Sequence, residues 1–136
     1  MDTFHFELVS PERLLFSGDV EQVDVPGAEG DFGVLPEHAP IVTTLRPGIL
    51  TVHDAGGEQK IVVLGGFAEF SANSLTVLAD IAAAVEDMDR TLIEARIGEL
   101  EQRITKADPG AALDKLIREL DHYKTINDHL SGTAMH

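Results

Sequence analysis

The sequence predicts a mainly β protein of the α+β class: an N-terminal antiparallel β-sandwich, or flattened barrel, over residues 1–85, followed by a C-terminal antiparallel two-helix hairpin over 86–136. Turn-forming residues concentrate in the first part, which holds nine of the 12 glycines and five of the six prolines. Apolar residues recur there with the two-residue period of half-buried strands, and beyond residue 85 with the period of a helix. Both changes fall at the same place, so we divide the chain there.

The strands follow from alternation and from turn residues. Apolar and polar side chains alternate over 3–8, which gives one apolar face. Two hairpins are predicted, one over 49–64 around the Ala-Gly-Gly turn at 55–57, and one over 67–78 around Asn73 and Ser74. We expect about eight to ten short strands, because turn signals recur at short intervals.

Helical spacing begins after residue 89. Spacings of four, three and four residues predict a first helix over about 90–107, with Asp89 or Asp87 as its N-cap. Asp108, Pro109 and Gly110 end it. A second helix follows, and we expect residues 131–136 to fray. The expected apolar stripe of the first helix is Ile93, Ile97, Leu100 and Ile104; that of the second is Leu113, Ile117, Leu120, Tyr123 or Lys124, and Asn127, broadened by Leu116 and Leu130.

Charge and composition exclude several classes of function. The formal net charge of −14 repels phosphate backbones, so a nucleic-acid binder is not expected. The absence of cysteine removes disulfides and thiolate metal sites. The N-terminus lacks the features of a signal peptide, and apolar runs such as 61–68 are far shorter than the roughly 20 residues of a spanning helix. We therefore expect proteins or cations as partners.

The residues carry no catalytic or metal-binding motif. The six histidines form neither HxH nor HExxH, so we expect no metal site and no cofactor. Ser17 and Ser71 lack the GxSxG context of a hydrolase. The glycine-rich stretch 27–33 carries Glu29 and Asp31, which favours a tight turn over an anion cradle. From the residues alone, one alternative is a free-standing sandwich that binds a small ligand or metal under a helical lid.

The order of five segments narrows these possibilities. They are LVSPERLLFSG at 8–18, VPGAEGDFGVLPEHAP at 25–40, PG at 47–48, GGFAEF at 65–70 and LTVLAD at 75–80. In this order and spacing they resemble the ε subunit family of bacterial F-type ATP synthases, homologous to the mitochondrial δ subunit. The resemblance covers essentially the whole chain, because a two-helix tail follows the sandwich at the expected place.

The resemblance implies a non-catalytic subunit of the central stalk, which turns with the rotor of a proton-translocating synthase. Its sandwich would bind the γ subunit and rest on the membrane c-ring, at the cytoplasmic face of the bacterial inner membrane. The matching loop runs from Glu29 to His38 and carries Asp31 where the family commonly has an acidic residue that faces the c-ring. By the same resemblance Glu29 and His38 contribute to this partner-binding surface. The alternative for His38 is a turn histidine whose ring hydrogen-bonds to the backbone.

The same resemblance makes the helical tail a regulatory element, which in inhibitory members reaches the catalytic β subunits. Members that bind ATP have an I/L-D-x-x-R-A segment, of which Asp89 survives here while Leu92 and Ile93 replace the Arg-Ala pair. We therefore expect nucleotide binding to be weak or absent, with Arg90 or Arg96 as the alternative cation. Residues 111–130 carry a net charge of −1, three basic against four acidic side chains, which predicts weak inhibition.

Overall fold

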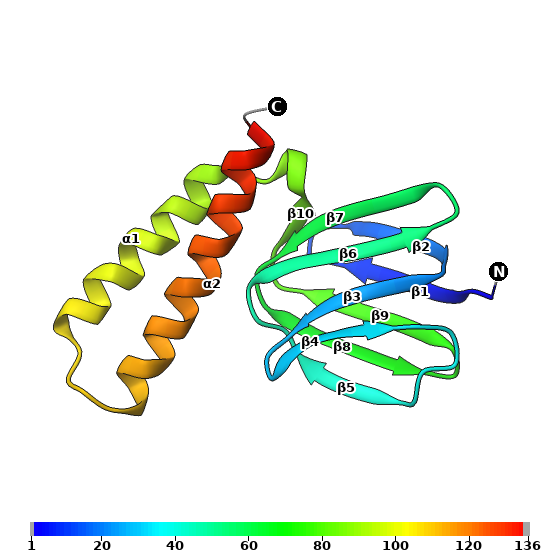
Figure 1. Ribbon diagram of the computed structural model, residues 1–136, viewed down its shortest axis with the longest axis horizontal. Helices are drawn as coiled ribbons and strands as arrows, with labels where there is room; N and C mark the ends of the chain where they lie inside the picture. The colour runs from blue at the N-terminus through cyan, green and yellow to red at the C-terminus, as the bar shows by residue number, and fades with distance from the viewer. Residues whose placement is uncertain (1, 135–136) are drawn as a thin grey trace.

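The structure is a computed structural model, which describes residues 2–134. Two five-stranded sheets stack face to face, and a pair of helices lies beside them (Figure 1). This confirms the predicted β-sandwich with a helical hairpin. The strands are β1 Phe4–Val9, β2 Leu14–Val20, β3 Gln22–Gly27, β4 Gly30–Val34, β5 Ile41–Thr44, β6 Gly48–Asp54, β7 Gly57–Val63, β8 Gly66–Ser71, β9 Ser74–Ala79 and β10 Ala82–Ala84.

The first sheet has the strand order β2-β1-β9-β8-β5, and the second has the order β10-β7-β6-β3-β4. All pairings are antiparallel except that of β1 with β9, which is parallel. The expectation of a wholly antiparallel sandwich is therefore wrong at this pairing. β1 and β9 are joined through the other sheet rather than by a hairpin, and such crossover connections permit parallel pairing.

The sandwich core comes entirely from the two facing sheets. Phe4 and Phe6 are fully buried, and the Phe4 ring packs edge-on against Phe70 with 5.6 Å between ring centroids. Every member of this cluster precedes residue 85. The strands therefore complete a hydrophobic core without the helices.

The predicted tight hairpins are confirmed. β6 and β7 are joined at Asp54 and Gly57, and β8 and β9 at Ser71 and Ser74. The β8–β9 turn places Ala72 and Asn73 at positive φ, as a two-residue turn of this kind requires. The 27–33 stretch is also a tight turn, because Gly27 pairs with Gly30 and the Ala28 amide donates to the Thr44 carbonyl.

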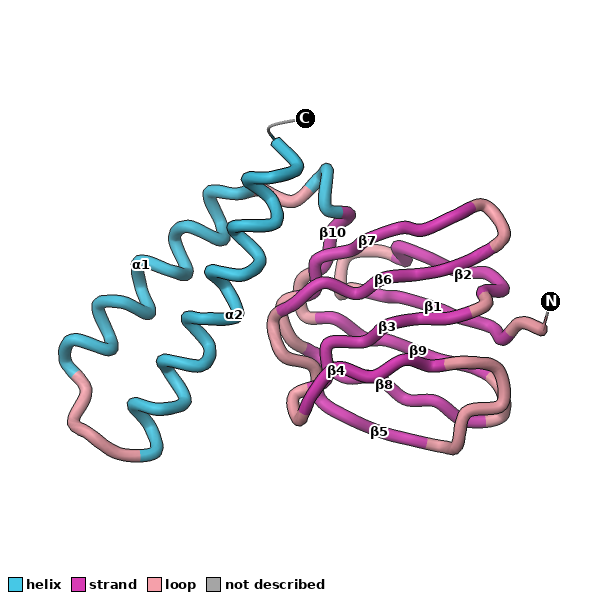
Figure 2. The backbone as a smooth tube through the Cα atoms, viewed as in Figure 1, coloured by secondary structure: helices cyan, strands magenta, loops and turns pink. Residues whose placement is uncertain are grey.

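A single 3₁₀ turn, Val85–Asp87, leads into α1 (Arg90–Lys106) and α2 (Ala111–Ala134). Asp89 caps α1, as predicted, by accepting from the Thr91 amide. Arg90 at the start of α1 donates to the Ser131 hydroxyl near the end of α2, so the helices are antiparallel (Figure 2).

Two details of α2 differ from the expected pattern. Ile117 is exposed and Ile126 is buried, because α2 turns its buried face toward the sandwich as well as toward α1. The expected fraying is wrong for residues 131–134, which are helical, since buried Leu130 and the Arg90–Ser131 hydrogen bond hold this turn. Residues 135 and 136 lie outside the described part of the chain.

α2 covers one end of the outer face of the second sheet. Tyr123, Ile126 and Leu130 join Val62 and Leu64 in a second apolar cluster, which also takes in Val85, Ile93 and Leu100. β6 contributes Ile49, which pairs with Val62 across the sheet. The hairpin is thus attached to the sandwich by hydrophobic burial, and the outer face of the first sheet faces away from it (Figure 1).

Candidate functional site

The outer face of the first sheet carries an unbroken row of side chains across all five strands. Thr44, Phe67, Leu78, Val9 and Leu14 occupy successive register positions on β5, β8, β9, β1 and β2. We call these five residues the outer belt. Four of them are apolar, and Leu14, Phe67 and Leu78 are 55%, 42% and 39% exposed.

The next row along the same face is mixed, with Val42, Glu69, Thr76, Glu7 and Ser17 in register. Val42 is 67% exposed and adds to the apolar surface, whereas the two glutamates form an acidic rim. A contiguous apolar strip with a polar rim is typical of a protein–protein contact surface. An exposed, partly apolar surface on the sandwich is what the family resemblance implies, but the sequence did not locate it, although the outward positions of these strands break the expected alternation with apolar residues.

The predicted acidic pair lies on the other sheet. Glu29 is exposed in the turn between β3 and β4, but Asp31 belongs to strand β4 rather than to a loop, which corrects the expectation. The strand forms because Asp31 pairs with Pro26 two residues beyond the tight turn. The Asp31 carboxylate is exposed and forms an ion pair with the guanidinium of Arg46.

His38 lies at the far end of β4 from Glu29 and Asp31, so the structure does not bring the three predicted residues together. Its Nδ1 lies 2.6 Å from the Ala39 carbonyl oxygen, and its ring is edge-on to Phe70. This is the geometry of a turn histidine hydrogen-bonded to the backbone, the second of the two alternatives.

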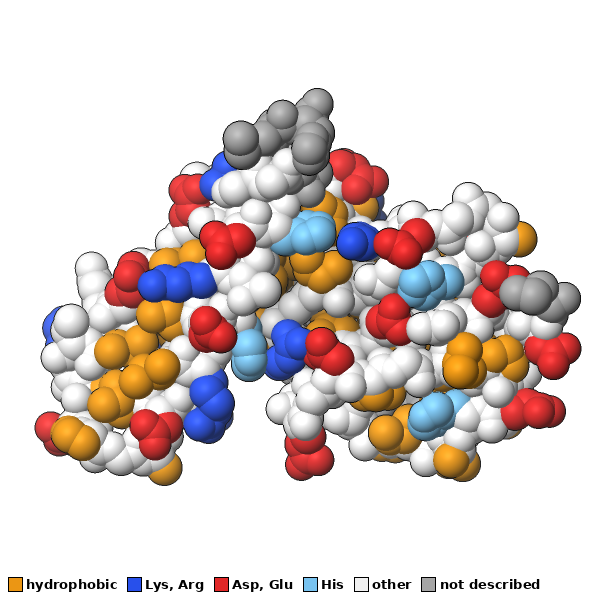
Figure 3. All heavy atoms as spheres, viewed as in Figure 1, with side chains coloured by type: hydrophobic (Ala, Val, Ile, Leu, Met, Phe, Trp, Pro, Cys, Tyr) orange, Lys and Arg blue, Asp and Glu red, His pale blue; other side chains and the backbone are white. Residues whose placement is uncertain are grey.

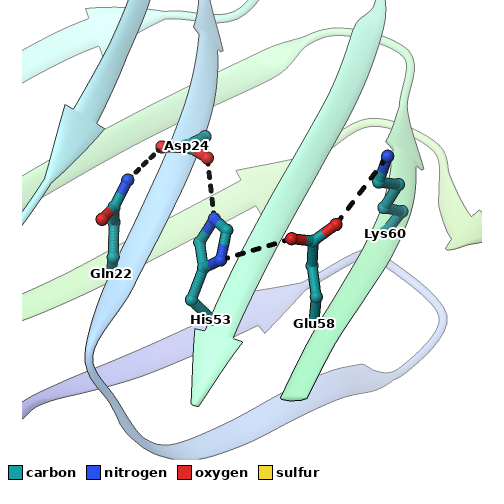
Figure 4. A network of polar contacts seen from close by, with 5 residues as sticks. All are labelled: Gln22, Asp24, His53, Glu58 and Lys60. Atoms are coloured by element: carbon teal, nitrogen blue, oxygen red, sulfur yellow. Dashed lines mark hydrogen bonds and ion pairs between the residues drawn. The ribbon is translucent and has the colours of Figure 1, made fainter.

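A polar network that the sequence did not reveal crosses the outer face of the second sheet (Figure 4). Asp24 on β3 accepts from Gln22 Nε2 at 2.7 Å and from His53 Nε2 on β6 at 2.8 Å. His53 Nδ1 lies 3.5 Å from Glu58 on β7, and Glu58 pairs with Lys60 at 3.8 Å. Partial burial of Asp24 opposes its ionisation, but the hydrogen bonds from His53 and Gln22 outweigh it and hold its pKa below 3.8.

Replacing Asp24 by Asn is expected to lower the free energy of unfolding at pH 7 by about 1 kcal/mol, the usual contribution of a partly exposed hydrogen bond to a charged group. Because the folded-state pKa of Asp24 is depressed, its stabilisation is present above the unfolded pKa and lost as the pH falls through the folded value. Denaturant midpoints from pH 7 to pH 2 should therefore converge for the two proteins. A constant difference across this range would contradict the assignment.

A cleft of about 540 Å³ lies between the hairpin and the sandwich, next to the second apolar cluster. Basic, acidic and histidine side chains gather where the two parts meet (Figure 3). The cleft is lined by four of the ten Lys and Arg residues of the chain, Arg46, Arg96, Lys115 and Arg118, together with His122. In a chain of net charge −14, this is a local concentration of positive charge.

The residues that replace the nucleotide motif have structural roles. Asp89 accepts from the hydroxyl and amide of Thr91, which lowers its pKa. Ile93 is fully buried and Leu92 packs against the same apolar cluster. Arg90 bonds Ser131 and pairs with Glu94, whereas Arg96 lines the cleft.

Within residues 2–134 the structure contains no group of three or more His, Asp or Glu side chains arranged to hold a metal ion. None of the helices in this described part has both the length and the apolar character needed to span a membrane.

Comparisons with known proteins agree on one family. Residues 3–85 match the family "ATP synthase, Delta/Epsilon chain, beta-sandwich domain". The chain is 59% identical to the ATP synthase epsilon chain of Rhodopseudomonas palustris strain BisB5, 57% to that of Nitrobacter winogradskyi and 56% to that of Afipia carboxidovorans. Each of these matches covers 136 residues and 100% of both chains.

Two solved structures share the fold. One is of the Euglena gracilis mitochondrial ATP synthase, OSCP/F1/c-ring, with a TM-score of 0.69 and 23% identity over 98% of this chain and 82% of that one. The other is of the Tetrahymena thermophila mitochondrial ATP synthase central stalk and c-ring, with a TM-score of 0.52 and 15% identity over 67% of this chain and 69% of that one.

Proposed function

Because this chain belongs to the ATP synthase delta/epsilon family, we propose that it is a subunit of the central stalk of an F-type ATP synthase that couples the γ subunit to the c-ring. The observation that carries the proposal is sequence identity of 55–59% over the full length to chains named ATP synthase epsilon chain. The role is mechanical rather than catalytic, at the cytoplasmic face of the bacterial inner membrane, and it transmits torque during proton-driven ATP synthesis.

The γ subunit binds the outer belt in this proposal. The belt lies on the face that the hairpin leaves open, and its exposed Phe67 and Leu78 are directly paired across β8 and β9. Burying two such side chains contributes about 1.5–3 kcal/mol each. The glutamate row beside the belt suits basic side chains at the rim of the contact.

The β3–β4 turn supplies the contact with the c-ring. Glu29 and Asp31 are exposed there, and the Arg46 guanidinium holds the Asp31 carboxylate in place. A polar loop of a neighbouring subunit can meet this carboxylate through charge-assisted hydrogen bonds. His38, at the other end of β4, lies outside this contact.

Replacing Asp31 by Arg is expected to weaken coupling while the fold survives, because the side chain is exposed. An exposed ionic contact contributes about 0.2–1 kcal/mol, so the proton gradient formed per ATP hydrolysed in membrane vesicles should fall by roughly twofold to fivefold at most. Asp31→Asn tests the charge alone. Arg46→Gln is the matched control, since it breaks the ion pair but keeps the carboxylate, and it should have the smaller effect. Unchanged pumping with Asp31→Arg would remove Asp31 from the contact.

The hairpin has a regulatory role of limited strength. It is docked on the sandwich through buried Tyr123, Ile126 and Leu130, and the net charge of −1 on residues 111–130 gives little long-range attraction to acidic loops of the catalytic β subunits. Weak or absent nucleotide binding remains a prediction, which the packing roles of Leu92 and Ile93 support.

Purification from native membranes tests the proposal as a whole. A tagged copy of the chain should bring down the α, β and γ subunits, and should leave the membrane with them when the catalytic head is stripped off. Recovery of the chain free of all three subunits would favour the alternative, a free-standing sandwich that binds a small ligand under a helical lid.

A further inference from the structure

Four of the histidines occupy three kinds of surroundings. His5 lies 3.7 Å from Glu7 and 3.6 Å from Asp19, and His53 lies between Asp24 and Glu58. His38 bonds a backbone carbonyl. His122 differs from these, because it is half-buried in the cleft between the hairpin and the sandwich, and no hydrogen bond or ion pair is recorded for it within residues 2–134.

Three elements contribute basic side chains to the cleft that His122 lines, and Arg46 is the cation among them that acts on the His122 imidazole. Arg46 projects from the segment between β5 and β6, Arg96 from α1, and Lys115 and Arg118 from α2 itself. The acidic groups on these sides are Asp80 and Glu119 in the cleft, with Asp31 on β4 and Asp121 on α2 close by. The other titratable neighbour is Tyr123, the next residue along α2 and part of the apolar cluster.

We propose that His122 makes docking of the helical hairpin sensitive to pH, so that protonation of its imidazole releases the hairpin from the sandwich. A protonated His122 places a further positive charge in a partly dehydrated cleft opposite Arg46, and both the loss of hydration and the like charge disfavour it there. When the hairpin moves away, the imidazolium regains water and leaves Arg46. The regulatory meaning of this release rests on the proposed function, but the release itself does not.

The direction of the pH dependence follows from the linkage between proton binding at His122 and docking of the hairpin. Burial lowers the pKa of His122 below its ordinary 6.5 and the charge of Arg46 lowers it further, while Asp121, Glu119 and Asp31 raise it without cancelling these effects. The docked state therefore binds this proton less tightly than the undocked state. Docking is fully favourable above the undocked pKa and is weakened as the pH falls below about 6.5.

The way in which the hairpin is attached to the sandwich permits such a pH-dependent release. On α2, the buried members of the second apolar cluster, Tyr123, Ile126 and Leu130, follow His122 along the chain, whereas Leu116 and Leu120, which precede it, are only partly buried. A charge that appears at His122, next to Tyr123, acts at the boundary between these two parts of α2. One titrating group can then shift the docking equilibrium without disrupting the sandwich core, which lies entirely in the other cluster.

The chain contains no cysteine, so a distance across the cleft can be measured with two introduced labels. Exposed Thr44 on β5 and exposed Ala112 on α2 are suitable sites for Thr44→Cys and Ala112→Cys with spin labels on the isolated full-length chain. Between pH 8 and pH 5.5 we expect the ratio of long to short distances to rise by at least about twofold. The same rise should be absent in His122→Gln, weaker in Arg46→Gln and retained in His5→Gln, whose histidine lies on the opposite sheet.

A distance distribution independent of pH in the parent chain, or an equal response in His122→Gln, would overturn the proposal. An undiminished response in Arg46→Gln would contradict the part assigned to Arg46. No other subunit takes part in this measurement, so its result is independent of whether the chain binds γ. A failure of the proposed function would appear as lost γ binding with the pH response intact.

Discussion

Replacing Phe67 and Leu78 together by Glu is expected to weaken binding to the γ subunit by at least about a hundredfold. Each side chain is a large apolar group at the centre of the outer belt, and burying a charge in its place removes roughly 1.5–3 kcal/mol of apolar burial and adds a desolvation cost. Two such losses exceed the 2.8 kcal/mol or so that corresponds to a hundredfold change. Titration calorimetry with purified γ measures the affinity directly.

The fold of this double variant should survive, because both side chains are more than a third exposed in the free chain. Thr51→Glu with Lys60→Gln is the matched control, since it makes the same change in net charge at two directly paired, outward positions of the second sheet. This control should bind γ normally. Equal loss of affinity in both variants would show that net charge, rather than the belt, controls the interaction.

Truncation of the chain after Asp87 is expected to leave a folded sandwich whose unfolding free energy is lower by roughly 3–6 kcal/mol. The sandwich keeps its own core cluster, but Val62, Leu64 and Val85 lose the helices that cover them. For a domain of this size the loss corresponds to a melting temperature lower by at least about 10 °C. Thermal unfolding followed by circular dichroism checks it, and ATPase activity of the reconstituted catalytic head should rise only modestly.

A second substitution distinguishes the loss of the helices that cover Val62 from a general loss of stability. Val62→Lys should destabilise the full-length chain, because it buries a charge beneath α2, but should be neutral or favourable in the truncated chain, where the position faces water. A destabilisation of equal size in both would contradict the assignment. A several-fold rise in ATPase on truncation would mean that apolar insertion of the hairpin into the catalytic head outweighs its unfavourable charge.

Local patterns predicted most of the fold. Alternation in β1, the turns at Ala55 and Asn73, and the spacing of apolar residues in α1 each reflect interactions within a few residues along the chain, and all are confirmed. The parallel pairing of β1 with β9 depends on residues some 70 positions apart, which no local pattern encodes. The burial of Ile126 instead of Ile117 depends on where α2 meets the sandwich.

The candidate site was less predictable for the same reason. The resemblance located Glu29, Asp31 and His38, but strand pairing places His38 at the opposite end of β4 from the other two. The outer belt collects one residue from each of five strands, and the cleft collects Arg46, Arg96 and His122 from three distant segments. Such surfaces follow from register and packing, which the sequence shows only where a family resemblance supplies them.

The central claim, that this chain joins the rotor through the outer face of its first sheet, is tested most directly by photo-cross-linking in the assembled synthase. A benzoylphenylalanine at Leu78 lies in the outer belt, and one at Lys60 lies on the outer face of the opposite sheet. A cross-link to γ is expected from position 78 and none from position 60. A γ cross-link from position 60 alone, or none from position 78 in an intact complex, would contradict the claim.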